Sequence, residues 1–163
     1  MMIDYTFFQD GLLMVDGAMA LATPSPTNEA IANRIGWYVD RYEPEYLCKL
    51  LGEELYNDFL VNRESAKWDE FKKLVVKTNG LAKTSPIANY VYFYLLRDSY
   101  ATATINGVKK DGDENLVSSR SKMVRAWNDM VYENRKLYVW LCRNFNNVPT
   151  EQELLETINV MGV

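Results

Sequence analysis

The chain has 163 residues, of which 48% are hydrophobic and 13% aromatic, and its net charge at pH 7 is −4. This composition is too rich in core-forming residues for a disordered chain, and the length suits one domain. The sequence has no histidine, which removes the usual general base, the commonest transition-metal ligand and every histidine-dependent nucleophile, so we predict that the protein is not an enzyme.

Two cysteines, Cys48 and Cys142, lie far apart and lack the spacing of a disulfide framework or a metal site. We expect both thiols to be buried in a reduced, cytoplasmic protein. No stretch approaches the ~20 apolar residues that a membrane-spanning helix needs. Residues 1–22 contain three aspartates and neither lysine nor arginine, which is unlike a secretory signal.

Residues 1–26 are predicted to form an N-terminal arm and linker, and residues 27–163 a single helical domain. Glycine and aspartate interrupt the arm, which is typical of a short strand or an irregular segment, and the linker reads ATPSPT. The first helix is predicted to be capped by Thr27 or Asn28 and to run through Tyr42.

A second helix is predicted to begin at Pro44 and to end at Gly52, which should adopt a positive φ between two short helices. The segment EELYNDFLV forms the next short helix, and Ser65 caps another that stops at Gly80. Apolar residues repeat at helical spacing along these segments. The expected core residues are Ile31, Ile35, Tyr38, Val39, Tyr42, Leu47, Leu50, Leu51, Leu55, Phe59, Trp68, Phe71, Leu74 and Val75.

Ser85 and Pro86 provide the cap and first position of a further helix, whose next ten residues are apolar or aromatic except Asn89. A helix that is apolar on all sides belongs in the centre of a bundle. The Asn106-Gly107 dipeptide then predicts a β-hairpin near 102–110.

The longest helix is predicted from Asp113 to about Phe145, and a last helix is predicted after it with Thr150 and Glu153 as a capping box. The expected fold class is therefore all-α: a helical bundle with one long C-terminal helix, one β-hairpin and an irregular N-terminal arm.

An acidic cluster between residues 41 and 60 admits three interpretations: a metal site, a catalytic carboxylate cluster or a solvated helix face. Its members are Glu43, Glu45, Glu53, Glu54 and Asp58. On a helix, Lys49 lies one turn from two of these acids, which gives ordinary ion pairs. A helical di-metal site would need Glu-x-x-His motifs, which the sequence lacks. We favour the solvated face, and next a partner-binding surface, and expect no catalytic, cofactor or metal residues.

The sequence also lacks phosphate-binding glycine motifs, and KKDGDENL departs from a calcium loop in its glycine and its final acid. Residues 61–150 hold 15 basic and 9 acidic side chains, whereas residues 1–60 hold 3 basic and 10 acidic ones. An overall pI near 5.0 argues against a dedicated DNA-binding protein. The asymmetry suits head-to-tail contact between copies, and a solvated surface explains it almost as well.

The order of segments resembles a known family. The pattern YxxxYEPEYLxxLLGxELY spans Tyr38 to Tyr56 and precedes a Trp-bearing helix, SPIANYVYFYLL, a TxTxxGV turn and LYVWLCRNFNNVP. Over roughly residues 28–149, this order is similar to that of head–tail connector (adaptor) proteins of tailed bacteriophages and Bacteroides-type prophages.

The resemblance implies a non-enzymatic structural protein without a cofactor. Its partners would be further copies in a homo-oligomeric ring, such as a dodecamer, together with the portal protein, a tail or stopper protein, and DNA that passes through without sequence recognition. It would be found in the bacterial cytoplasm and, after assembly, in the virion neck, with no membrane partner. The alternative is a small helical protein-interaction or regulatory module of a mobile element, with or without contact to nucleic acid.

The residues expected to mediate such contacts lie in the hairpin and in the acidic cluster. An exposed apolar pair beside two lysines suits docking on an acidic surface of an adjacent copy. The predicted interaction residues are Ile105, Asn106, Gly107, Val108, Lys109, Lys110, Glu45, Glu53 and Glu54.

Overall fold

The computed structural model describes residues 1–16, 18, 26–79, 82–99, 101–104, 107–110 and 119–159. Its helices are α1 (Pro26–Val61), α2 (Ala66–Val75), α3 (Pro86–Ser99) and α4 (Ser119–Asn144). The described strands form two antiparallel hairpins, β1 (Lys77–Asn79) with β2 (Ala82–Thr84), and β3 (Ala101–Thr104) with β4 (Gly107–Lys110). Short 3₁₀ helices occur at η1 (Tyr5–Phe8), η2 (Gly11–Leu13) and η4 (Gln152–Leu155). The all-α fold class is confirmed.

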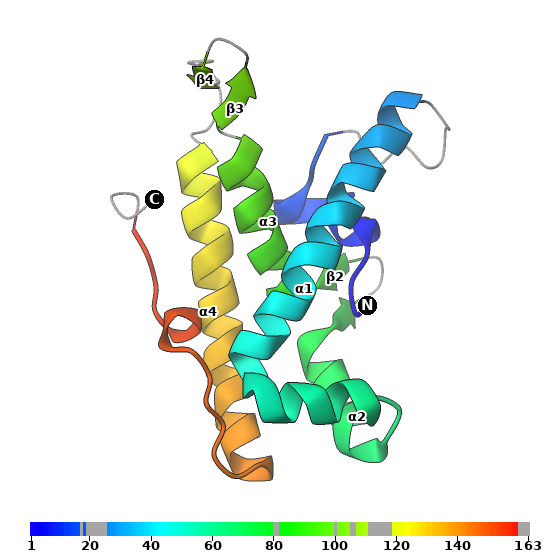
Figure 1. Ribbon diagram of the computed structural model, residues 1–163, viewed down its shortest axis with the longest axis vertical. Helices are drawn as coiled ribbons and strands as arrows, with labels where there is room; N and C mark the ends of the chain where they lie inside the picture. The colour runs from blue at the N-terminus through cyan, green and yellow to red at the C-terminus, as the bar shows by residue number, and fades with distance from the viewer. Residues whose placement is uncertain are drawn as a thin grey trace.

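The helices α1, α3 and α4 pack along the long axis of the molecule (Figure 1). At one end α1 bends toward α2, and at the other the β3–β4 hairpin projects beyond the ends of α3 and α4. The core forms between these helices, where α3 contacts both α1 and α4. Most of these predicted core residues are buried, because the apolar stripes of the helices face one another. The exceptions are Ile31, Leu55 and Leu74, which are partly buried and pack against the core.

Helix α1 continues through Pro44, so the predicted helix boundary at that residue is wrong. Pro44 lies on the exposed side of α1, where solvent can hydrate the Asp40 carbonyl that loses its helical partner. The helix is interrupted at Gly52, with φ 74° and ψ 163°, which confirms the positive φ predicted there. The segments on either side of Gly52 therefore differ in direction.

Helix α2 starts after Ser65 as predicted, but it ends at Val75, and the chain enters the β1–β2 hairpin. The predicted helix to Gly80 is therefore too long. The hydroxyl of Ser65 makes no capping bond and is buried without a partner in the described part of the chain. Helix α3 starts at Pro86, and the Ile87 amide donates to the Ser85 hydroxyl at 3.2 Å, as the capping prediction required.

The C-terminal segment is extended rather than helical and runs along the outer side of α4 (Figure 1). We call residues 148–159 the C-terminal strap. Only Gln152–Leu155 forms a 3₁₀ turn, and its flanking residue Glu151 makes no side-chain cap. Thr150 instead donates to the Leu50 carbonyl at 2.6 Å, so the predicted capping box is wrong. The strap gains more from packing Leu154, which is fully buried, than a short exposed helix would offer.

The cysteine prediction is also corrected by the structure. Both thiols are free, but Cys142 is exposed and Cys48 is only half-buried. Cys142 lies near the exposed end of α4, on the side away from the core residue Leu141. Within the described ranges, no helix combines the length and the apolar character needed to cross a bilayer.

Candidate functional site

The β3–β4 hairpin projects from one end of the helical bundle, beyond α3 and α4 (Figure 1). Thr104 pairs with Gly107, so Gly107 begins β4 instead of occupying the turn, one residue from the predicted position. Ile105 and Asn106 lie outside the described residues. The remaining pairs are Ala103↔Val108, Thr102↔Lys109 and Ala101↔Lys110. Residues 107–110 of the predicted site are therefore strand residues at the free end of the bundle.

Glu43 does not belong to a solvated face. It is only 5% exposed, and its two carboxylate oxygens accept hydrogen bonds from the Met2 amide (2.7 Å) and the Ile3 amide (3.1 Å). A buried carboxylate is stable only when its oxygens are satisfied, and the backbone of the arm supplies the donors here. The prediction of a solvated helix face is therefore wrong for Glu43. This side chain instead attaches the N-terminal arm to α1.

Glu45 and Lys49 form the ion pair expected for one helical turn, at 3.4 Å. The second predicted ion pair, between Lys49 and Glu53, is not formed, because Gly52 changes the direction of α1 between them. Lys49 instead binds Glu153 of the C-terminal strap at 2.5 Å. Burial opposes its charge, but the hydrogen bond and charge of Glu153 outweigh that cost and raise the pKa of Lys49. Glu45 also accepts from the Tyr90 hydroxyl at 2.9 Å, so it is engaged within the fold.

Glu53 and Glu54 are exposed, as predicted, on the part of α1 beyond the kink. Leu60 and Val61 lie on the same short segment and are 54% and 82% exposed. Of the three predicted acidic site residues, the structure therefore leaves only these two free to meet a partner. It groups them with two large aliphatic side chains that the sequence prediction did not include.

We predict that the acidic residues of α1 bind no metal ion. No cluster of three or more candidate metal ligands occurs among the described residues. Adding a chelator should therefore leave the melting temperature unchanged, and elemental analysis should find no stoichiometric metal. A chelator-induced fall of several degrees would contradict the prediction, since a bound ion stabilises the folded state by mass action.

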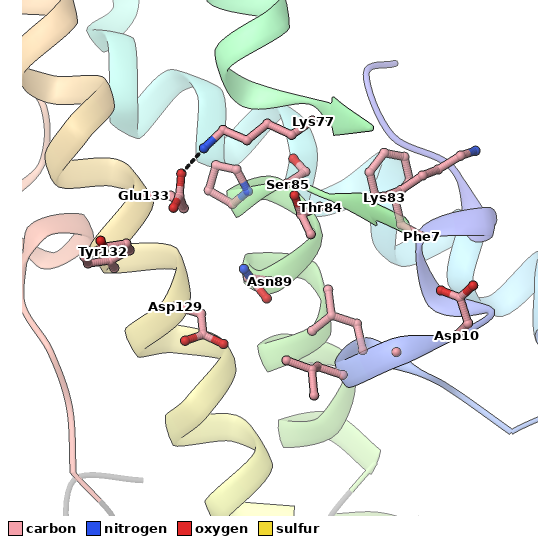
Figure 2. Close-up of a pocket in the computed structure, with 14 residues that line it drawn as sticks. Phe7, Asp10, Lys77, Lys83, Thr84, Ser85, Asn89, Asp129, Tyr132 and Glu133 are labelled. Atoms are coloured by element: carbon pink, nitrogen blue, oxygen red, sulfur yellow. Dashed lines mark hydrogen bonds and ion pairs between the residues drawn. The ribbon is translucent and has the colours of Figure 1, made fainter. Parts of the chain in front are cut away.

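A cleft of ≈420 Å³ lies between the N-terminal arm, the start of α3 and α4 (Figure 2). Its apolar wall includes Phe7, Leu12, Leu13 and Pro86. From α3, Asn89 projects toward the side of α4 that carries Asp129 and Glu133. The volume is within the usual range of small-molecule sites, about 300–1,000 Å³.

Most charged groups that line this cleft have partners within the fold. Glu133 pairs with Lys77 and, at 2.8 Å, with Lys136. Partial burial opposes ionisation of Glu133, but these two lysines outweigh it and hold its pKa below the ordinary value. Lys83 donates to Thr6 at 2.6 Å. Paired charges of this kind fix the arm and the β1–β2 hairpin in place and form no nucleophile–base pair.

Sequence reasoning missed the cleft because one wall is the N-terminal arm, which was predicted only as an irregular segment. Phe7 and Phe8 of η1 are buried in the core, and Leu13 of η2 packs against it. The phenylalanine pair was the available signal, since adjacent aromatic residues in an arm need an apolar surface to cover them.

Comparison with known proteins gives no match: no protein-family model, curated protein or solved structure is similar to the chain.

Proposed function

We propose that the chain is a structural head–tail connector (adaptor) that assembles as a ring on a phage or prophage portal and lets DNA pass to the tail. The observation that carries the proposal is the β3–β4 hairpin, which projects from the free end of a helical bundle. An isolated two-stranded hairpin is marginally stable in water, so a neighbouring surface is a natural source of additional order.

Further support comes from the sequence resemblance and from the character of the polar sites. The charged groups of the ≈420 Å³ cleft are largely engaged in contacts within the fold. The chain has no histidine to act as a general base. A scaffold that binds macromolecules through its surface accounts for these features. In this proposal the protein is made in the bacterial cytoplasm and becomes part of the virion neck.

The test of this function is assembly of hairpin variants on a portal protein, taken from the gene neighbourhood where it encodes one. We predict that replacing Ile105 and Val108 by Ser, or Lys109 and Lys110 by Glu, leaves the melting temperature of the monomer nearly unchanged. The same changes should abolish ring formation or portal attachment, measured by light scattering after size-exclusion chromatography. High salt should reproduce the charge variant in the wild type, because exposed charges are screened within about 8 Å at physiological ionic strength.

A matched control replaces Lys73 and Arg143 by Glu, which changes the net charge equally at two exposed helical positions. This control should assemble like the wild type. Normal assembly of the hairpin variants would contradict the docking role, and unfolding of the double Ser variant would mean that the hairpin belongs to the core. A gene neighbourhood without portal and capsid genes would favour the alternative interaction module.

A further inference from the structure

Trp37 lies on the outer side of α1 and is 60% exposed, although it is the largest of the exposed hydrophobic side chains in the described part of the chain. Its ring meets that of its sequence neighbour Tyr38, edge to face, at 5.1 Å between centroids. Within the described residues, its indole N–H has no hydrogen-bond partner. Tryptophan is enriched among the few residues that carry most of the binding energy at interfaces. The exposed indole of Trp37 therefore suits a contact with another surface.

Two arginines flank Trp37 on the same side of α1. Helical spacing places Arg34 one turn before it and Arg41 one turn after it, and both are exposed. Arg34 donates to the Ser99 hydroxyl at 2.9 Å, whereas Arg41 has neither an ion pair nor a hydrogen bond with any described residue. Asp40 borders this side, which keeps a net positive charge. We call Arg34, Trp37 and Arg41 the Trp37 knob.

The ≈420 Å³ cleft has the size and the lining to receive an indole ring. Its apolar wall includes Phe7, Leu12, Leu13 and Pro86. The Asn89 side chain projects across it (Figure 2), and its amide has no hydrogen-bond partner among the described residues. A cavity of about 150 Å³ holds benzene, so the cleft has room for the larger indole.

The acids of the cleft complement the arginines of the Trp37 knob. Asp10 and Asp129 both line the cleft and are exposed. Asp10 has no ion pair within the described ranges, and Asp129 has a long one, 3.9 Å from Arg125. Exposed charge pairs add little affinity, but they orient two surfaces as they meet.

We infer that the Trp37 knob of one copy inserts into the cleft of a second copy of this chain, an inference that rests on the proposed function. The indole ring packs against the apolar wall, and its N–H donates to the amide oxygen of Asn89. The arginines of the knob face Asp10 and Asp129. A tryptophan that becomes buried needs such a partner for its N–H, and the free amide of Asn89 supplies it.

The contact is between molecules. Helix α1 contributes none of the described residues that line the cleft, and Trp37 lies opposite the core residues Ile35 and Val39 of the same helix. A knob on one element that enters a cleft between other elements is a heterologous contact, which generates rings where the rotation closes. Each copy then gives one knob and receives one.

One side chain in a cleft buries far less area than the roughly 1,200–2,000 Å² of a stable interface, so the contact between two free copies is weak. When a portal holds many copies side by side, the effective concentration rises and the same contact becomes saturated. The inference therefore predicts a monomer in dilute solution and a ring on the template.

Photo-crosslinking is the direct test on the full chain. Replacing Trp37 by p-benzoylphenylalanine places a photoreactive aromatic ketone at the tip of the knob, and light couples it to nearby C–H groups. At about 1 mM protein we expect links to Leu12 or Leu13 of a second copy, identified by mass spectrometry of isotopically mixed copies. The absence of links between copies overturns the inference.

Two variants that each remove one half of the contact sharpen the test. Trp37→Ala removes the knob, and Asn89→Trp fills the cleft with a side chain of its own. Each should reduce self-association about tenfold or more, measured by sedimentation. If melting shows that Asn89→Trp does not fold, Thr84→Trp takes its place, because Thr84 lines the same cleft from an exposed position.

An equimolar mixture of the knob variant and the cleft variant should form heterodimers and nothing larger, because one intact knob then meets one intact cleft. A mixture that stays monomeric overturns the inference. Variants that associate like the wild type overturn it as well.

Free indole tests the cleft without relying on a second copy. Excess indole should shift the nitrogen-15 NMR signals of Leu13 and Asn89 and weaken self-association of the wild type. If indole shifts neither signal, or shifts them without weakening association, the inference is overturned.

A matched control separates this contact from a general loss of exposed apolar surface. Val61→Ser removes a side chain that is 82% exposed at the other end of α1, and it should leave association unchanged. If Trp37→Ala forms normal rings on the portal, this contact is wrong and the connector role stands. If the links between copies form but the wild type does not bind the portal, the connector role fails and the contact stands.

Discussion

Replacing Gly52 by Ala is expected to lower the free energy of unfolding by about 2–5 kcal/mol. Gly52 has φ 74° and ψ 163°, a backbone region that residues with a Cβ hardly enter. A Cβ at this position would also lie 2.2 Å from Cγ of Pro149 in the C-terminal strap. Strain and overlap therefore add, and the expected effect exceeds what the positive φ alone would cause. Urea denaturation measures the difference.

Gly36 supplies the matched control within the same helix. It lies inside the regular part of α1, and a Cβ there would meet no atom within 4 Å. Gly36→Ala should therefore stabilise the protein by roughly 0.5–1 kcal/mol. Adding Pro149→Ala to Gly52→Ala should restore the part of the unfolding free energy that is lost through overlap of the new Cβ with the Pro149 ring. If Gly52→Ala is neutral or stabilising, α1 is unbroken from Pro44 to Val61 in solution.

The Gly52 kink ends the first segment of α1, and the backbone carbonyl groups at this helix end need hydrogen-bond donors from elsewhere. Helix C-termini leave carbonyl groups without intrahelical donors. The strap supplies two donors: the Glu151 amide binds the Lys49 carbonyl at 2.9 Å, and the Thr150 hydroxyl binds that of Leu50. The close fit of Gly52 to Pro149 thus positions the strap to cap α1 from a distant part of the sequence.

Local sequence signals were sufficient for most of the fold. Ser85 and Pro86 marked the start of α3, and the helical spacing of Ile35, Tyr38 and Val39 marked the buried side of α1. Helix caps and apolar helix faces depend on residues within one or two turns of each other, so a short stretch of sequence is enough to predict them. The β1–β2 hairpin also had a local sequence signal, the Asn79-Gly80 dipeptide. The prediction missed this hairpin because it continued the helix to Gly80.

The features that sequence reasoning missed depend on contacts between distant segments. In the sequence, Glu43 cannot be distinguished from a solvated acidic residue on a helix. Its burial depends on hydrogen bonds from the amides of Met2 and Ile3, which are distant in the chain. The strap sequence has a good capping box, but the side chains of Thr150 and Glu153 find partners on α1 instead. Local propensity is a weak prior, and tertiary contacts override it where they satisfy more buried groups.

Replacing Asn134 by Leu is expected to destabilise the protein by about 2–4 kcal/mol, because two buried polar groups lose their partner. Asn134 is fully buried on α4 and joins three elements. Its Oδ1 accepts from the hydroxyl of Tyr46 on α1, and its Nδ2 donates to the Leu154 carbonyl of the strap at 2.9 Å. Burial raises the pKa of Tyr46 well above its ordinary value, so the hydroxyl stays protonated and donates.

A double-mutant cycle distinguishes this bridge from simple loss of packing. Tyr46→Phe removes the hydroxyl that Asn134→Leu would leave without an acceptor, so the double variant should be more stable than the sum of the single losses predicts. Asn144→Leu is the control, because the Asn144 side chain donates to the Trp140 carbonyl in an exposed position, and its effect should stay within about 0.5 kcal/mol. Urea melts give the free energies, and amide exchange at Leu154 and Leu155 reports whether the strap has detached. Additive losses in the cycle, or an Asn134→Leu variant as stable as the wild type, would mean that the strap and α1 are held to α4 by apolar packing and not by this buried amide.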